Sequence, residues 1–314
     1  MTREEALQHL LSQAPWPSGS LYGYHSCSPI WDTRPSATWR VGIEAEKEDV
    51  HGKTLAQRYQ GDREDYLPHS WRAERDGSLS YDGFELISPI YNLMDAKILN
   101  DIYDPVLGFL LNSDSSYRCG GHMTLSKRDM NGVELFKAIE PFVPLFYALF
   151  PKRAKTRGYA AFADKDTPKE NKYCAFHILS DRVEIRIFSA IKSVTQLTWR
   201  IELLRLIAVL TEHALTQHEV YQMLMNPTTR LHRHLAKVYT KKLGEKIMLT
   251  HAYTKAYQKE GVFTFSEYVR IKGKVPRGVF DGRVPVLPAK TNNNNSKQLT
   301  LDVCDYLEEN PGEA

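Results

Sequence analysis

Residues 39–46 read Trp-Arg-Val-Gly-Ile-Glu-Ala-Glu, and this stretch decides the fold. A β-strand points successive side chains to opposite faces. The odd-numbered residues of the stretch are apolar, whereas Gly42, Glu44 and Glu46 alternate with them. The pattern predicts a strand over Thr38–Glu46 with its apolar face on a core and both carboxylates on the other face. A plain amphipathic strand with a solvated outer face explains the same pattern, so the stretch alone does not establish a site.

The same alternation recurs twice further along the chain. Residues 121–126 read Gly-His-Met-Thr-Leu-Ser, which places His122 on the face opposite the apolar residues. Residues 183–188 read Val-Glu-Ile-Arg-Ile-Phe, which does the same for Glu184 and Arg186. If these strands share one sheet with the first, their polar groups lie on one surface.

Two more acids lie in a strand-rich stretch from about Trp71 to Ile90. Asp82-Gly83 is a typical hairpin turn dipeptide, so we expect a hairpin there. Asp76 and Glu85 would lie near its strand ends, where an acid is often only a rim residue.

The remaining periodicities predict helices interspersed with strands. Pro105 interrupts the helical spacing of residues 92–111. The pattern favours an α+β fold around an antiparallel or mixed sheet. Further helices are expected at 1–11, 133–150, 194–215 and 217–259, and further strands at 173–179 and 182–189.

Four segments are expected along the chain. An irregular N-terminal leader covers 1–37, and a catalytic core covers 38–215. A basic helical extension follows at 216–290, and a flexible linker with an acidic tail covers 291–314.

Composition narrows the class of protein. The chain has 314 residues, of which 42% are hydrophobic and 25% charged, as in globular proteins. Apolar runs are too short to cross a bilayer. The four cysteines show neither zinc spacing nor a disulfide framework, so a cytoplasmic location is expected. The basic residues after Arg233 suggest a solvated surface or an anionic partner, although no aromatic–basic pattern favours nucleic acid.

A shared face would bring Glu44, Glu46, Glu85, Glu184 and Asp76 together beside His122. Clustered carboxylates repel one another, and their desolvation is costly unless cations compensate. Carboxylate oxygens with one imidazole suit Mg²⁺ or Mn²⁺ better than zinc. Arg186 on the same face could hold a carboxylate or a phosphate.

In this order, the motifs resemble the amidoligase family of the carboxylate–amine ligase superfamily, which includes glutamine synthetase and glutamate–cysteine ligase. The likeness spans about residues 38–215. Its matching pieces are Gly42-Ile43-Glu44-Ala45-Glu46, Asp76-Gly77-Ser78-Leu79, Glu85-Leu86-Ile87-Ser88-Pro89, Cys119-Gly120-Gly121-His122, Arg153, Tyr173-Cys174 and Val183-Glu184-Ile185-Arg186-Ile187-Phe188.

The resemblance implies a glutamine-synthetase-like sheet whose concave face binds ATP and two or three Mg²⁺ ions, with helices on the other face. It implies catalytic roles for Arg186 and Arg153, and nucleotide binding by Arg153, Lys172 and Arg186. The implied metal ligands are Glu44, Glu46, Asp76, Glu85, His122 and Glu184. Thr124 departs from the family, which often has a second histidine there, and this departure puts substrate contacts in doubt.

The function expected from these residues and this likeness is ATP-dependent joining of a carboxylate to an amine through an acyl phosphate. The substrates would be an amino acid, a peptide or a protein side chain, and no general base is evident beyond a guess at Asp164 or Asp166. A two-metal phosphoesterase and a non-catalytic binding protein of the same fold stay open as alternatives. A homo-oligomer is also compatible with the sequence.

Overall fold

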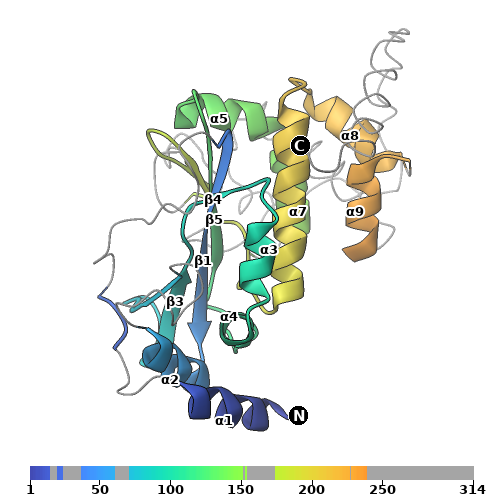
Figure 1. Cartoon of the computed structure of the whole chain (residues 1–314). Coiled ribbons are helices and arrows are strands. Elements are labelled where there is room, and N and C mark those ends of the chain that lie inside the picture. The colour runs from blue at the N-terminus through green and yellow to red at the C-terminus, as the bar shows by residue number, and fades with distance from the viewer. Residues whose placement is uncertain are drawn as a thin grey trace, which may run out of the picture. The chain divides into compact units, whose positions relative to one another are not determined.

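The computed structural model describes residues 1–14, 20–23, 37–60, 71–150, 153, 174–226 and 228–238. It is an α+β protein with an open antiparallel sheet and helices (Figure 1). The chain forms two compact units. The first consists of Met1–Gly132 and Leu179–Leu204, and the second of Val133–Ile178 and the chain from Arg205 onward. The α+β class expected from the sequence is therefore confirmed.

Seven strands take part in the sheet. Six belong to the first unit, in the order β2-β3-β1-β5-β7 with β4 beside β1, and all their pairings are antiparallel. The seventh, β6 (Phe176–Ile178), belongs to the second unit. The bounds of the six are Trp39–Glu48 for β1, Arg72–Glu74 for β2, Gly83–Ile87 for β3, Tyr91–Asn92 for β4, Gly121–Lys127 for β5 and Val183–Ile185 for β7.

Strand β1 lies between β3 and β5 (Figure 1). Its apolar face is buried in the core. Trp39, Val41 and Ile43 are at most 4% exposed. Each fully buried side chain of this size stabilises the fold by roughly 1.5–3 kcal/mol relative to an exposed one. The strand predicted from residues 39–46 is confirmed, and it extends two residues further, to Glu48.

The β2–β3 hairpin is present, and its connection is longer than the predicted Asp82-Gly83 turn. Residues 75–82 connect the two strands, and Glu74 pairs with Glu85 across them. Gly83 is the first residue of β3, and its N–H donates to the Ser80 carbonyl oxygen, which closes a turn that contains Asp82. Its missing side chain serves close packing, because a Cβ there would lie 2.3 Å from Leu79 Cβ.

Helices in the first unit begin with α1 (Arg3–Gln13). Thr2 and Glu5 form a capping box at its start, and Leu7 and Leu10 are buried, which confirms the N-terminal helix. Asp49 caps α2 (Val50–Tyr59), a helix that the sequence analysis did not predict. The others are α3 (Lys97–Ile102), α4 (Pro105–Leu111) and the part of α7 (Val194–Thr211) up to Leu204.

The second unit contains shorter helices than expected. The predicted helix over 133–150 is divided into α5 (Gly132–Ile139), a 3₁₀ turn (Glu140–Phe142) and α6 (Val143–Leu149). Pro141 and Pro144 explain the division, because proline lacks the N–H that a continuous helix requires. Phe176 of β6 packs edge-on against Phe136 and Phe146, at centroid distances of 5.8 and 5.4 Å.

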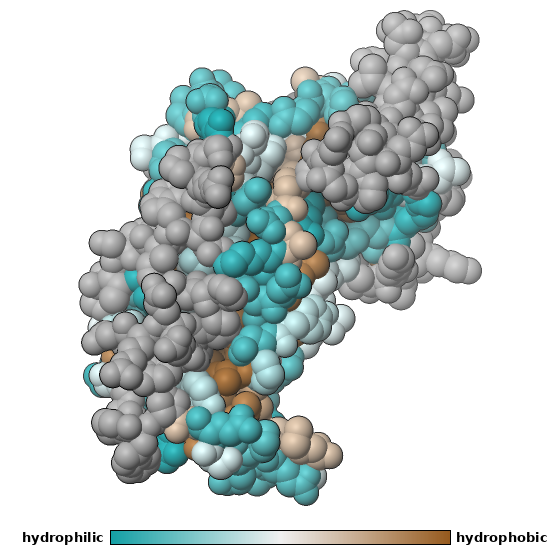
Figure 2. Space-filling model, in the orientation of Figure 1, coloured by the Kyte–Doolittle hydropathy of each residue, from teal (hydrophilic) through white to brown (hydrophobic). Residues whose placement is uncertain are grey.

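Helices α8 (Gln217–Met225) and α9 (Arg230–Val238) follow. They confirm the first part of the helices predicted for 217–259, and the remainder of that stretch and the predicted tail lie outside the described residues. Among the residues described, no helix is long and apolar enough to cross a membrane. In the view of Figure 2, hydrophobic residues of the coloured part reach the surface only as small areas between hydrophilic ones.

Candidate metal centre

The polar face of β1 carries the centre of the candidate site. Register places His122 of β5 directly across from Glu44, and Glu85 of β3 directly across from Glu46. Glu184 of β7 pairs with Thr124, so it lies on the same face one step along β5. Opposed positions on neighbouring strands share a face, with Cβ atoms about 4.5–5.5 Å apart. The three strands predicted from alternation therefore do form one surface.

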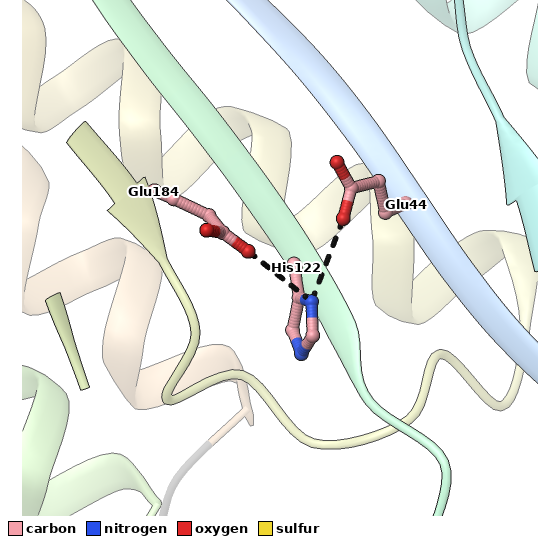
Figure 3. A group of neighbouring side chains, drawn as sticks. All are labelled: Glu44, His122 and Glu184. Atoms are coloured by element: carbon pink, nitrogen blue, oxygen red, sulfur yellow. Dashed lines mark ion pairs between the residues drawn. The ribbon is translucent and has the colours of Figure 1, made fainter. Parts of the chain in front are cut away.

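The first group of side chains is Glu44, His122 and Glu184 (Figure 3). Nδ1 of His122 lies 3.5 Å from Oε2 of Glu44 and 3.4 Å from Oε1 of Glu184. The two carboxylates thus approach the same ring nitrogen from β1 and from β7. His122 is only 4% exposed.

The second group is Glu46, Asp76 and Glu85. In each group, one potential ligand atom per residue lies within 4.8 Å of the others. Asp76 comes from the β2–β3 connection, so the loop that replaced the predicted tight turn supplies a member of the site.

His122 links the two groups. Its Nε2 lies 3.8 Å from Oε1 of Glu46, and this nitrogen is buried without a hydrogen-bond partner within the described part of the chain. A buried polar atom that lacks a partner costs free energy and calls for an explanation. A cation between Nε2 and Glu46 would satisfy this nitrogen, whereas Nδ1 faces Glu44 and Glu184 of the first group.

Neighbouring groups hold the acids in place. The Gly120 backbone N–H donates to Oε2 of Glu46 at 2.5 Å, and the Ser78 N–H donates to Oδ1 of Asp76 at 2.8 Å. Glu184 forms an ion pair with Arg186 from its own strand. These contacts fix the carboxylates before any ligand arrives.

Electrostatics in the second group disfavour its fully ionised form. Burial raises the pKa of Glu85 well above its ordinary value, and the negative charges of Glu44, Glu46, Asp76 and Glu74 add to the effect. Glu85 is 4% exposed, so water screens this repulsion poorly. A divalent cation would remove both penalties at once.

The donor set fits hard divalent cations. It offers carboxylate oxygens and one imidazole, and the described residues of the site include no thiolate among the ligand atoms. Mg²⁺ and Mn²⁺ prefer such oxygen-rich surroundings, whereas structural zinc sites use thiolates and several histidines. All six predicted metal ligands are brought together, in two groups of three.

The predicted cationic residues are placed less completely. Arg186 lies at the edge of the first group through its ion pair with Glu184. Arg153 belongs to the second unit, and Lys172, Asp164 and Asp166 lie outside the described residues. Thr124, where the related family often has a second histidine, lies between Gly42 and Glu184 on the polar face.

Sequence analysis missed one buried ion pair on this face. Glu74 pairs across the hairpin with Glu85 and is 1% exposed, and its Oε1 lies 4.0 Å from Nη2 of Arg72. The alternation of Arg72, Ala73 and Glu74 was a usable signal. It was not recognised because β2 is only three residues long.

The glycine pair before His122 is explained by close packing. A Cβ on Gly121 would lie 2.7 Å from the Ser189 carbonyl oxygen and 2.9 Å from Nη1 of Arg200. Gly120 also forms a bridge with Ser189. The turn after β7 therefore approaches β5 too closely for any side chain at Gly121.

We expect Gly121→Ala to lower the free energy of unfolding by about 1–3 kcal/mol, the usual cost of overpacking. Gly77→Ala is the matched control, because a Cβ at Gly77 meets nothing within 4 Å. Chemical denaturation of both variants measures the difference. Equal stability of the two variants would contradict the packing argument.

No protein-family model matches the chain, and a search of curated proteins finds no match.

Proposed function

We propose that this protein is an ATP-dependent ligase that joins a carboxylate to an amine, on a glutamine-synthetase-like sheet. The observation that carries the proposal is the convergence of five carboxylates and His122 on one sheet face, in two adjoining groups. The motif order that resembles the amidoligases supports the same conclusion. A pair of divalent cations there would bridge nucleotide phosphates and neutralise charge that develops during phosphoryl transfer.

The residues of the chain would serve distinct purposes. Glu44, His122 and Glu184 hold one cation, and Glu46, Asp76 and Glu85 hold the other. The ligands are anchored on four successive strands, β3, β1, β5 and β7, and on the adjoining loop, so little reorganisation is needed when the nucleotide arrives. Arg186, beside Glu184, supplies a positive charge for the oxygens of the transferring group.

The proposed reaction has two steps. A substrate carboxylate oxygen attacks the γ-phosphorus of ATP, the bond to the β-phosphate oxygen breaks, and ADP leaves. An amine then attacks the carbonyl carbon of the acyl phosphate, phosphate leaves, and the amine proton passes to a base. The protein supplies no nucleophile in this scheme.

The first experiment measures nucleotide binding and turnover by the full chain. Binding of a non-hydrolysable ATP analogue is recorded by calorimetry with Mn²⁺ and without it. Release of ADP and phosphate is then followed with Mg²⁺ and pools of amino acids and peptides. We expect Mn²⁺-dependent binding, and phosphate release that requires both a carboxylate and an amine.

Two variants make the experiment specific. Glu44→Gln keeps the shape of a first-group ligand but removes its charge, and should lower turnover by at least about 10²-fold. Glu4→Gln, an exposed acid of α1, is the control and should leave turnover unchanged. Absence of nucleotide binding, or cleavage of phosphate esters without an amine, would overturn the ligase in favour of a binding protein or a phosphoesterase.

A further inference from the structure

Two exposed tyrosines lie in loops that are bonded to Glu48, the last residue of β1. Tyr81 is 90% exposed and Tyr117 is 88% exposed. Each immediately follows a serine, as Ser80-Tyr81 in the β2–β3 connection and as Ser116-Tyr117 in the loop before β5. The two Ser-Tyr pairs lie 36 positions apart in the sequence.

Glu48 joins these two loops. It is the last residue of β1 and follows Glu44 and Glu46 on the polar face. The Ser80 N–H donates to its Oε1 at 2.8 Å. The Glu48 backbone N–H donates to the Asp114 carbonyl oxygen at 3.1 Å, in the loop that carries Tyr117. Glu48 therefore binds both of the loops that carry the tyrosines.

The position of Glu48 relates the tyrosines to the metal centre. A strand rises about 3.4 Å per residue, so Glu48 lies about 7 Å beyond Glu46 along β1. Asp76, in the loop that carries Tyr81, belongs to the second group, and Gly120, just after the loop that carries Tyr117, binds Glu46. The two loops that carry the tyrosines thus also carry, or end at, residues that belong to the second group or bind it.

Each tyrosine ring also has a cation beside it. Nζ of Lys53 lies 4.1 Å from the ring centroid of Tyr81, and the Arg118 guanidinium carbon lies 5.9 Å from that of Tyr117. A cation on one face leaves the other face of an exposed ring for a flat ligand. The cations would in addition attract a ligand that carries phosphates.

We propose that Tyr81 and Tyr117 form the base-binding part of the nucleotide site, where the purine ring stacks on one or both tyrosines. This inference rests on the proposed function, because it assumes that the phosphates bind at the two acidic groups. Stacking on an aromatic ring contributes substantially to the binding of a base, and it requires no hydrogen-bond partner in the ring. Glu48 holds both loops in place through its bonds to Ser80 and Asp114.

The test compares ATP with inorganic tripolyphosphate, which carries the phosphates without the base. Dissociation constants are measured by calorimetry with Mn²⁺ for the full chain and for Tyr81→Ala, Tyr117→Ala and the corresponding Tyr→Phe variants. Both positions are exposed, so the substitutions should not disturb folding. Tyr103→Ala, at a 61% exposed tyrosine that follows α3, is the matched control.

We expect an alanine at Tyr81 or Tyr117 to weaken ATP binding about 10-fold, in line with the loss of one aromatic stack. Tripolyphosphate binding should not change, and the Tyr→Phe variants should bind ATP as the unaltered protein does. Unchanged ATP binding in both alanine variants would overturn the inference, as would an equal loss for ATP and tripolyphosphate. If the unaltered protein binds neither, the proposed function itself fails, and this outcome is distinct from the other two.

Discussion

Glu85→Gln is expected to change metal binding and stability in opposite directions. It removes one ligand of the second group. Losing a residue that merely supports a metal ligand typically lowers metal affinity or activity by about 10–100-fold, so losing a ligand should lower Mn²⁺ affinity and turnover by about 10²-fold or more. The cation-free protein should become more stable near neutral pH, because a buried negative charge is replaced by a neutral group of the same shape. Calorimetric titration with Mn²⁺ and thermal unfolding in EDTA measure the two effects.

The pH dependence of stability separates this cause from a general packing change. Burial first, and neighbouring acids second, raise the pKa of Glu85 in the folded protein above its unfolded value. In that interval of pH the folded protein binds more protons than the unfolded chain. The stability of the cation-free protein should therefore fall as pH rises from the unfolded pKa through the folded one. Glu85→Gln should lack this fall.

Glu74→Gln is the matched control for the first prediction. Glu74 is equally buried and directly across the hairpin, but it has the Arg72 guanidinium beside it. Removing its charge leaves Arg72 without that partner, which typically costs about 3–5 kcal/mol in a buried pair. We expect the control to be destabilised where Glu85→Gln is stabilised. If both variants shift in the same direction, charge repulsion at Glu85 is not the cause.

Much of the site was predictable because its strands alternate with a period of two. Once apolar residues occupy one face, Glu44, His122 and Glu184 must share the other, and a shift of register by one residue would expose the whole core face. The grouping into two sets of three was not predictable. It depends on which strands are neighbours, and the order β3-β1-β5-β7 is a long-range property of the chain.

Two features escaped for different physical reasons. The Asp82-Gly83 dipeptide has the composition of a tight hairpin turn. In the structure, Gly83 is required because Leu79 packs so closely against it that a side chain would not fit. Lys47 occupies a position on the apolar face of β1. From the sequence, a charged residue at such a position indicates that the buried part of the strand has ended. No local pattern shows that three carbonyl groups, distant in sequence, meet it there.

Lys47 is the second site at which a large effect is expected. Its side chain is fully buried on the core face of β1. Nζ donates to the carbonyl oxygens of Leu111, Ser113 and Ile191 at 2.7, 3.1 and 2.5 Å. An ammonium has three N–H donors, so these three acceptors use all of them. The bonds tie the end of β1 to the end of α4 and to the segment before α7.

Lys47→Met should therefore be strongly destabilising. Methionine fills a similar volume, yet it leaves three buried carbonyl oxygens without this donor, and each such loss costs about 1–3 kcal/mol. The gain from no longer burying an ammonium offsets part of that sum, so we expect a net loss of about 3 kcal/mol. Lys192→Met is the control, because Lys192 is exposed and adjoins Ile191. Urea denaturation of both variants measures the difference in the free energy of unfolding. Equal stability of the two variants would contradict a stabilising role for the three hydrogen bonds of Lys47.

The same lysine should make the free energy of unfolding depend on pH above about pH 7. Desolvation by burial lowers the pKa of Lys47 from 10.5 to about 7, while Cys119 and Asp49 oppose the shift. Below about pH 7 the lysine is protonated in both states, and the folded protein bears the full desolvation cost. Between about 7 and 10.5 the unfolded chain binds more protons, so stability should rise with pH. The slope is at most about 1.4 kcal/mol per pH unit for one proton.

The difference in unfolding free energy between the unaltered protein and Lys47→Met should grow between about pH 7 and 10.5, because the contributions of other titrating groups cancel in the difference. A difference that stays constant from pH 7 to 10 would mean that the three carbonyl groups keep the ammonium charged in the folded protein.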